Sequence, residues 1–144
     1  MKWINHFIKL AEVVSTMSKD PNHKIGAVIV DKNNRIVSTG FNGFAKGIDD
    51  TDERLNDKET KRLLMLHAEE NAILYAKQDL TDCSIYIYGY PPCVHCTSII
   101  IQSGIKTIYY KNSNKHNTVS DYWKANLEMA QRLAKEADVA VVDL

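Results

Sequence analysis

Apolar side chains recur at helical spacing near the start of the chain and crowd together just after it. An amphipathic helix that faces a core is predicted by steps of four and three between Trp3, Phe7, Leu10, Val14 and Met17. The polar run SKDPN, residues 18–22, ends this helix because proline cannot continue it. The apolar run IGAVIVD, a turn with two asparagines, and RIVSTGF then predict a β-hairpin over residues 25–41.

The rest of the chain alternates predicted helices and strands. A charged stretch, residues 45–62, predicts a surface loop with a short helix. The periodicity then predicts helices over 66–77, 93–103 and 123–137, strands over 83–89, 106–110 and 139–144, and a polar loop over 111–117. Gly104 directly follows the second of these helices, in the position where a glycine commonly ends a helix.

This order of elements predicts the fold. A helix between the last two strands makes them parallel neighbours by the usual crossover rule. We therefore expect a single α/β domain over residues 1–144, a three-layer α/β/α sandwich around a five-stranded mixed sheet.

Composition narrows the class of partner. Lys and Arg total 18 and Asp and Glu total 18, so the formal net charge is zero, and the chain lacks the positive field that nucleic acid or an anionic membrane requires. No run approaches the roughly 20 apolar residues of a membrane helix. We therefore expect a soluble cytoplasmic protein with a small-molecule partner. In a reducing compartment a close cysteine pair is more often metal-binding or catalytic than a disulfide.

The candidate metal-binding and catalytic side chains lie in and near two segments, the first of which is PPCVHC, residues 91–96. Cys93 and Cys96 offer two thiolates, and His67 in LHAEEN, at the start of the preceding predicted helix, offers a third ligand. A catalytic zinc site needs three protein ligands and one open position for water. Glu69, two residues past His67, is expected to face the same site without being a ligand.

The cysteine pair has two other interpretations. A redox pair of the thioredoxin type belongs just after the first strand of a βαβ unit and needs no upstream histidine. A structural zinc site needs a fourth ligand, but His95 is expected to point away and Cys83 is interpreted as a core thiol. His-x-Glu followed by Pro-Cys-x-x-Cys is the signature of zinc nucleobase deaminases.

The chain resembles the cytidine/deoxycytidylate deaminase superfamily from Trp3 to about Val142, with the deoxycytidylate branch matching best. Four blocks carry the resemblance in the family's order and spacing: SKDPNHKIGAVIV (18–30), GFNGFAKGIDD (40–50), HAEENAI (67–73) and PPCVHCTSIIIQSGIK (91–106). His67 itself argues against the free cytidine deaminases, which usually have cysteine there.

The resemblance implies an activity and a set of roles. It implies hydrolysis of dCMP to dUMP with release of ammonia, at one Zn²⁺ held by His67, Cys93 and Cys96. Glu69 would move protons between water, ring N3 and the departing amine. The backbone N–H of Ala68 would bind the pyrimidine O2, and Asn42 would hold a sugar hydroxyl.

Departures from the family pattern leave the phosphate contact open. Many members carry arginine at the position of Met17 and tyrosine at that of Lys115. Four cations are candidates for the 5′-phosphate: Lys19, Lys24, Lys115 and His116. The family also implies a homo-oligomer, a dimer or hexamer, and dCTP or dTTP as effectors near Asp49 and Asp50.

Other functions remain as alternatives. The first is a deaminase acting on another cytosine nucleotide or nucleoside, such as dCTP, 5-substituted dCMP or deoxycytidine. A nucleic-acid base deaminase is disfavoured by the neutral charge, and a non-catalytic zinc-binding module is disfavoured by the intact Glu69.

Overall fold

A five-stranded mixed sheet forms the centre of the molecule. The computed structural model describes residues 1–114 and 118–144. The sheet order is β2-β1-β5-β6-β7, in which β1 is antiparallel to both neighbours and β5, β6 and β7 are parallel. The bounds are β1 Gly26–Val30, β2 Ile36–Phe41, β5 Ser84–Gly89, β6 Thr107–Asn112 and β7 Ala140–Asp143. The predicted hairpin and the parallel final strands are both confirmed.

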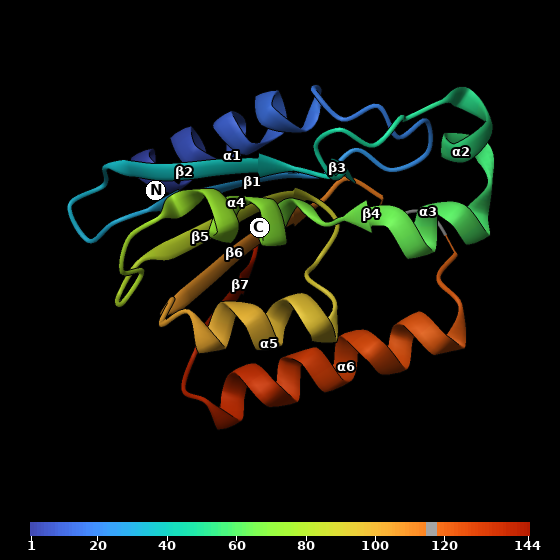
Figure 1. Ribbon diagram of the computed structural model, residues 1–144. Coiled ribbons are helices and arrows are strands. Elements are labelled where there is room, and N and C mark those ends of the chain that lie inside the picture. The colour runs from blue at the N-terminus through green and yellow to red at the C-terminus, as the bar shows by residue number, and fades with distance from the viewer. Residues whose placement is uncertain (115–117) are drawn as a thin grey trace.

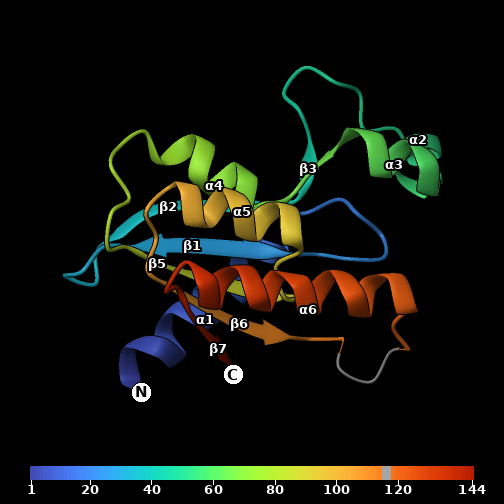
Figure 2. The ribbon, with the colours of Figure 1, turned by 90° about the horizontal axis from the view of Figure 1, so that it is seen from below.

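Helices cover both faces of this sheet. Helix α1 (Lys2–Ser15) packs on one face, and α4 (Ala68–Ala76), α5 (Val94–Gln102) and α6 (Asp121–Glu136) lie side by side on the other (Figures 1 and 2). The predicted three-layer sandwich is therefore confirmed. None of the helices in the described part of the chain is long and apolar enough to cross a bilayer.

The charged stretch after the hairpin contains more structure than expected. Two short helices, α2 (Asp52–Asn56) and α3 (Lys58–Leu64), replace the predicted loop with one helix, and they project from one end of the sandwich (Figure 2). Short strands flank them, β3 (Gly43–Phe44) and β4 (Met65–Leu66), which pair with each other. A further difference is that β6 runs to Asn112, into the predicted polar loop, where it continues its pairing with β5.

The buried face of α1 differs from the predicted stripe. Phe7, Ile8 and Ala11 are buried, whereas Trp3 is 50% exposed and Met17 lies beyond the helix. A side chain on Gly26 would place its Cβ 2.1 Å from the Ala11 carbonyl oxygen. The helix backbone therefore meets β1 at Ala11, and this contact turns Trp3 toward solvent.

A second close approach fixes α4. A Cβ on Gly40 in β2 would lie 2.4 Å from both the Ala68 carbonyl oxygen and the Ala72 amide nitrogen. Ala68 and Ala72 are themselves fully buried, so α4 lies with its backbone directly against β2. Because His67 immediately precedes α4, this contact also places the start of the candidate site.

We expect Gly40→Ala to destabilise the protein, because the added methyl group has no room without moving α4. Overpacking of this kind typically costs about 1–3 kcal/mol. Gly43→Ala is the matched control, since its Cβ would meet only the Phe41 ring, at 4.0 Å. Urea denaturation of both variants measures the difference, and equal unfolding midpoints would contradict the proposed packing constraint.

Candidate metal centre

The N-termini of α4 and α5 meet at one point. His67 is the N-cap residue of α4, Cys93 is the N-cap residue of α5, and Cys96 lies in the first turn of α5. The His67 Nδ1 atom lies 3.1 Å from the Cys96 Sγ and 3.7 Å from the Cys93 Sγ. In the described part of the chain this is the one group of three or more potential ligands whose atoms lie within 4.8 Å of one another.

The sheet explains why two distant segments converge here. β4 pairs with β3, with Leu66 opposite Gly43, so His67 follows directly from this ladder. The loop that carries Cys93 leaves the carboxyl end of β5 after Gly89, where φ is +120°. Ligands of α/β proteins commonly bind at the carboxyl ends of parallel strands, beside helix N-termini.

The donor set fits zinc. Tetrahedral zinc with sulfur ligands at about 2.3 Å and nitrogen at about 2.0–2.1 Å places its ligand atoms on the order of 3.5 Å apart. The separations of 3.1 and 3.7 Å from His67 Nδ1 to the two sulfurs match that spacing. One histidine and two cysteines leave a fourth position open, as catalytic rather than structural zinc sites do.

Hydrogen bonds within the triad also set its charges. The Cys96 thiol, followed by His67, lowers the pKa of Cys93 to about 4. The hydrogen bond with Cys93 raises the pKa of His67 to about 9, and bonding to Cys93 together with burial raises the pKa of Cys96. Cys93 therefore presents a thiolate at neutral pH, while metal binding displaces the protons held by His67 and Cys96.

Glu69 lies in the first turn of α4, buried beside the triad. It is 5% exposed, and burial raises the pKa of its carboxyl, an effect that hydrogen bonds and the His67 charge partly offset. A buried carboxyl with a raised pKa can hold a proton near neutrality and still release it. Its placement beside the candidate ligands is consistent with the proton-shuttle role, which stays a proposal.

Glu70, which the motif alone does not distinguish from a helix-surface residue, also contacts the candidate site. Its Oε1 accepts a hydrogen bond of 2.9 Å from the His67 backbone N–H, and its side chain is only 20% exposed. A glutamate in the third helical position commonly reaches back in this way to the N-cap residue. Glu70 therefore orients the histidine ligand.

Two further expectations about the ligand set concern His95 and Cys83. The His95 side chain is 70% exposed and its Nε2 lies 3.9 Å from Glu70 Oε2, outside the ligand group. Cys83 is 3% exposed within the apolar core. The interpretation of Cys83 as a core thiol is therefore confirmed.

Asn42 ties a neighbouring loop to the sheet. Its Oδ1 accepts from the Ile25 amide at 2.9 Å, its Nδ2 donates to the His23 carbonyl at 2.8 Å, and the Ser18 hydroxyl donates to its carbonyl oxygen. One amide hydrogen and one lone pair remain for a ligand. Ala68, whose backbone N–H is proposed to bind the pyrimidine, is fully buried between His67 and Glu69 in the chain.

Sequence reasoning missed an ion pair that supports the same loop. The Lys61 ammonium in α3 lies 2.9 Å from Asp20 Oδ1, and the two side chains are 13% and 7% exposed. Burial opposes ionisation of Asp20, but backbone N–H groups and Lys61 together lower its pKa. Lys61 lies in a run of charged residues, and nothing in such a run distinguishes the one whose partner is buried.

The four phosphate candidates have different surroundings. Lys19 forms a 3.0 Å ion pair with Asp50 and is 69% exposed, whereas the Lys24 ammonium donates to the Ser18 carbonyl. Lys115 and His116 lie outside the described residues. Trp123 is 39% exposed on α6 and meets the Tyr90 ring edge-on at 6.4 Å between centroids.

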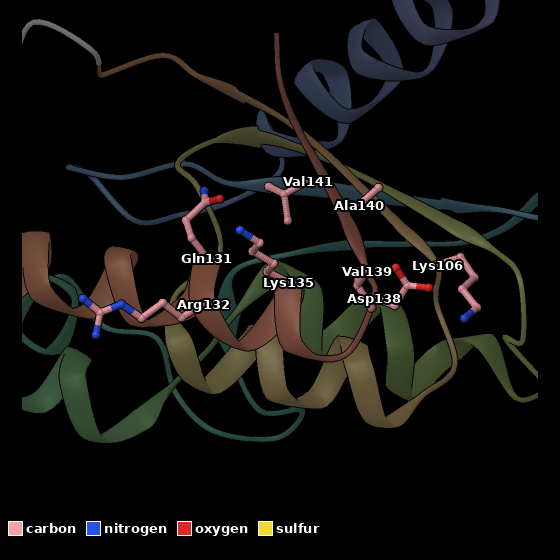
Figure 3. A pocket seen from close by; sticks show the side chains of 8 residues that line it. All are labelled: Lys106, Gln131, Arg132, Lys135, Asp138, Val139, Ala140 and Val141. Carbon is pink, nitrogen blue, oxygen red and sulfur yellow. The ribbon is translucent and has the colours of Figure 1, made fainter.

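One sizeable pocket is remote from this centre. A cavity of about 490 Å³ lies between the end of α6 and β7 and is lined by Lys106, Gln131, Arg132, Lys135, Asp138, Val139, Ala140 and Val141. Figure 3 shows that its cations do not converge: Lys135 extends toward Val141, while Arg132 points away. It contains no candidate ligand, so the metal centre is assigned on chemistry rather than on pocket size.

Comparison with known proteins places these residues in context. The family model described as the cytidine and deoxycytidylate deaminase zinc-binding region matches residues 1–112. A protein of Aliivibrio fischeri named as an uncharacterised deaminase is 41% identical over 140 residues, covering 97% of this chain and 92% of its own length. Human deoxycytidylate deaminase is 36% identical over 126 residues, covering 82% of this chain and 69% of its own length.

A solved structure supports the fold. The dCMP deaminase of cyanophage S-TIM5 in its apo form superposes with a TM-score of 0.75 at 23% identity, covering 99% of this chain and 98% of that one. Both the sheet and its helices are therefore shared with an enzyme of known structure.

We expect one zinc ion per chain, and we expect Cys96→Ala to lose it, because two ligands hold the ion far less tightly than three. Elemental analysis after dialysis measures the zinc content. Cys83→Ser is the matched control, since Cys83 lies in the apolar core. Full zinc retention in Cys96→Ala, or zinc loss in Cys83→Ser with the fold intact, would overturn the ligand assignment.

Proposed function

Because the chain belongs to the cytidine and deoxycytidylate deaminase family, we propose that it hydrolyses dCMP to dUMP and ammonia. The observation that carries this proposal is the triad of His67, Cys93 and Cys96 with the buried Glu69 beside it. The human relative at 36% identity is named deoxycytidylate deaminase, which supports dCMP as the substrate.

The reaction replaces an amine with an oxygen at C4 of cytosine. Zinc held by His67, Cys93 and Cys96 would supply Lewis acidity that makes water a better nucleophile. Glu69 takes one proton from the water that adds to C4 and passes it to ring N3. It then takes the remaining proton from the oxygen now attached to C4 and delivers it to the departing amine, so the C4–N bond breaks, the C4 carbonyl forms, ammonia leaves and uracil remains. One carboxyl can perform both transfers because burial raises its pKa above the ordinary value for a glutamate, which favours the protonated form between the two transfers.

Other residues hold the substrate in register. The Ala68 N–H, at the start of α4, donates to the pyrimidine O2, where the positive end of the helix favours partial negative charge. Asn42 uses its remaining amide hydrogen on a sugar hydroxyl while its existing bonds to His23 and Ile25 keep it in place. Orientation of this kind lowers the entropy cost of reaching the transition state.

The 5′-phosphate is proposed to contact cations from the loops around the centre. Lys19 is available because an exposed ion pair, such as the one with Asp50, contributes little and yields to a dianion. Lys24 remains a candidate, as do Lys115 and His116, which lie outside the described residues. A deaminase of another cytosine nucleotide or nucleoside stays the alternative, and substrate comparison separates the two.

Assembly and regulation are proposed from the family and from the surface. We propose a homo-oligomer, a dimer or hexamer. Large apolar side chains exposed on α3 and α4 support it, namely Leu63, Leu74 and Tyr75. Regulation by dCTP and dTTP near Asp49 and Asp50, a cytoplasmic location and a single-domain organisation stay predictions. Sedimentation analysis with and without dCTP measures the oligomeric state and its response to this nucleotide.

Glu69→Gln is expected to keep zinc and lose turnover, because glutamine preserves the shape of the side chain but cannot carry a proton. General acid–base catalysis contributes about 10²–10⁴-fold, so kcat should fall at least that much. Uracil release and zinc content are measured on the same preparation. Near-normal turnover with zinc bound would rule out Glu69 as the proton shuttle and redirect attention to Glu70.

The substrate itself is tested by comparing kcat/KM for dCMP and deoxycytidine. We expect dCMP to be preferred, because charge-assisted hydrogen bonds to phosphate are roughly twice as strong as neutral ones. Equal values would show that the phosphate is not recognised and would favour a nucleoside deaminase.

Alanine at each candidate cation then locates the phosphate contact. The substitution at the true contact should lower kcat/KM for dCMP but not for deoxycytidine. Lys135→Ala, at the remote pocket, is the control and should change neither. If none of Lys19, Lys24, Lys115 and His116 shows the effect, the phosphate is bound elsewhere.

A further inference from the structure

A side chain of α6 contacts the turn that carries both cysteine ligands. Asn126 Oδ1 accepts a hydrogen bond of 2.8 Å from the backbone N–H of Val94, the residue directly after Cys93. Asn126 is half-buried, and the two helices pack along each other (Figure 2). Asn126 is not a candidate zinc ligand, and it is not among the residues assigned to catalysis or substrate binding.

The first turn of α5 needs an acceptor from outside. A helix leaves its first N–H groups without intrahelical partners, and an N-cap side chain usually satisfies one of them. Here the N-cap residue is Cys93, whose sulfur accepts from the Cys96 N–H at only 3.4 Å and is also a candidate zinc ligand. The cap serves the Cys96 N–H and leaves the Val94 N–H without a partner in its own helix. The Val94 N–H donates instead to Asn126 on the neighbouring helix.

Asparagine is a poor choice for the interior of a helix. It lowers helix stability relative to alanine because its amide competes for backbone hydrogen bonds. Asn126 nevertheless lies in the sixth position of α6, and its side-chain oxygen accepts a hydrogen bond from α5 rather than from the backbone of α6. The next residue, Leu127, lines a small cavity with Pro91 and Pro92, so this part of α6 backs the whole loop.

We propose that Asn126 is a positioning residue for the metal centre. It holds the peptide group that joins Cys93 to Val94, and through this turn it sets the directions in which the sulfurs of Cys93 and Cys96 face the ion. Groups that hydrogen-bond to the ligand segments hold the ligand atoms in the tetrahedral arrangement of a zinc site, and their removal typically changes metal affinity about 10–100-fold. The inference rests on the zinc site of the proposed function but not on the identity of the substrate.

The experiment follows release of zinc to a chelator from the purified protein. Asn126→Leu removes the acceptor at nearly constant volume and is expected to release zinc about 10–100-fold faster. Asn126→Asp keeps an acceptor oxygen at the same place and is expected to stay close to the parent protein. Glu128→Leu, a polar-to-leucine change at an exposed position of the same helix, is the control and should leave release unchanged.

Cobalt provides a readout that a purely structural role would not move. In Co²⁺-substituted protein the sulfur-to-cobalt absorption bands report ligand geometry, and we expect Asn126→Leu, but not Glu128→Leu, to shift them. If Asn126→Leu does not fold, Asn126→Gln displaces the acceptor by one methylene and is expected to show the same direction of change.

Three outcomes would overturn the proposal. The first is zinc release and cobalt spectra in folded Asn126→Leu or Asn126→Gln that match the parent. The second is a loss of thermal stability that is equal with and without zinc, which would make Asn126 a packing residue only. The third is faster release in Asn126→Asp as well, which would show that the acceptor oxygen is not what matters. Failure of dCMP turnover alone would count against the proposed function instead.

Discussion

The convergence of two helix N-termini on one point is the constraint on which the rest of the molecule depends. Three ligand atoms from α4 and α5 must come within a few ångströms, and the residues that carry them are 26 positions apart between His67 and Cys93. Rigid contacts achieve this: α4 lies with its backbone against β2 at Gly40, and a loop of only four residues joins the buried strand β5 to α5. The apolar core therefore determines the geometry of a polar site.

The layers and the grouping of the three candidate ligands could be predicted from the sequence because both follow from local patterns. Periodicity marked the strands and helices, and His-x-Glu with Pro-Cys-x-x-Cys marked the triad. The interpretation of α1 was less accurate, because its inward face is decided by a glycine in β1 that lets Ala11 approach. A hydrophobic stripe on a helix does not contain that information.

The supporting contacts could not be predicted, since each joins residues that look ordinary in the sequence. Lys61 is one lysine among several in a charged run, yet it is the partner of buried Asp20. Asn126 is one polar residue on a largely exposed helix, and Glu70 resembles any surface glutamate. Such residues become visible only when the fold shows which backbone groups lack a local partner.

The short β3–β4 ladder has a consequence for how the chain can change in length. It brings together the two ends of the segment 45–64, because Gly43 pairs with Leu66. The position of His67, the residue after Leu66, is therefore set by this pairing and not by the length of the segment. The entropy of closing a loop grows only slowly with its length, by about 0.6 kcal/mol for each doubling. Extra segments, even a folded module, can therefore be spliced in ahead of α2 without disturbing the metal centre. A deletion that removes α3 cannot be made so freely, because Lys61 anchors the loop beside the site.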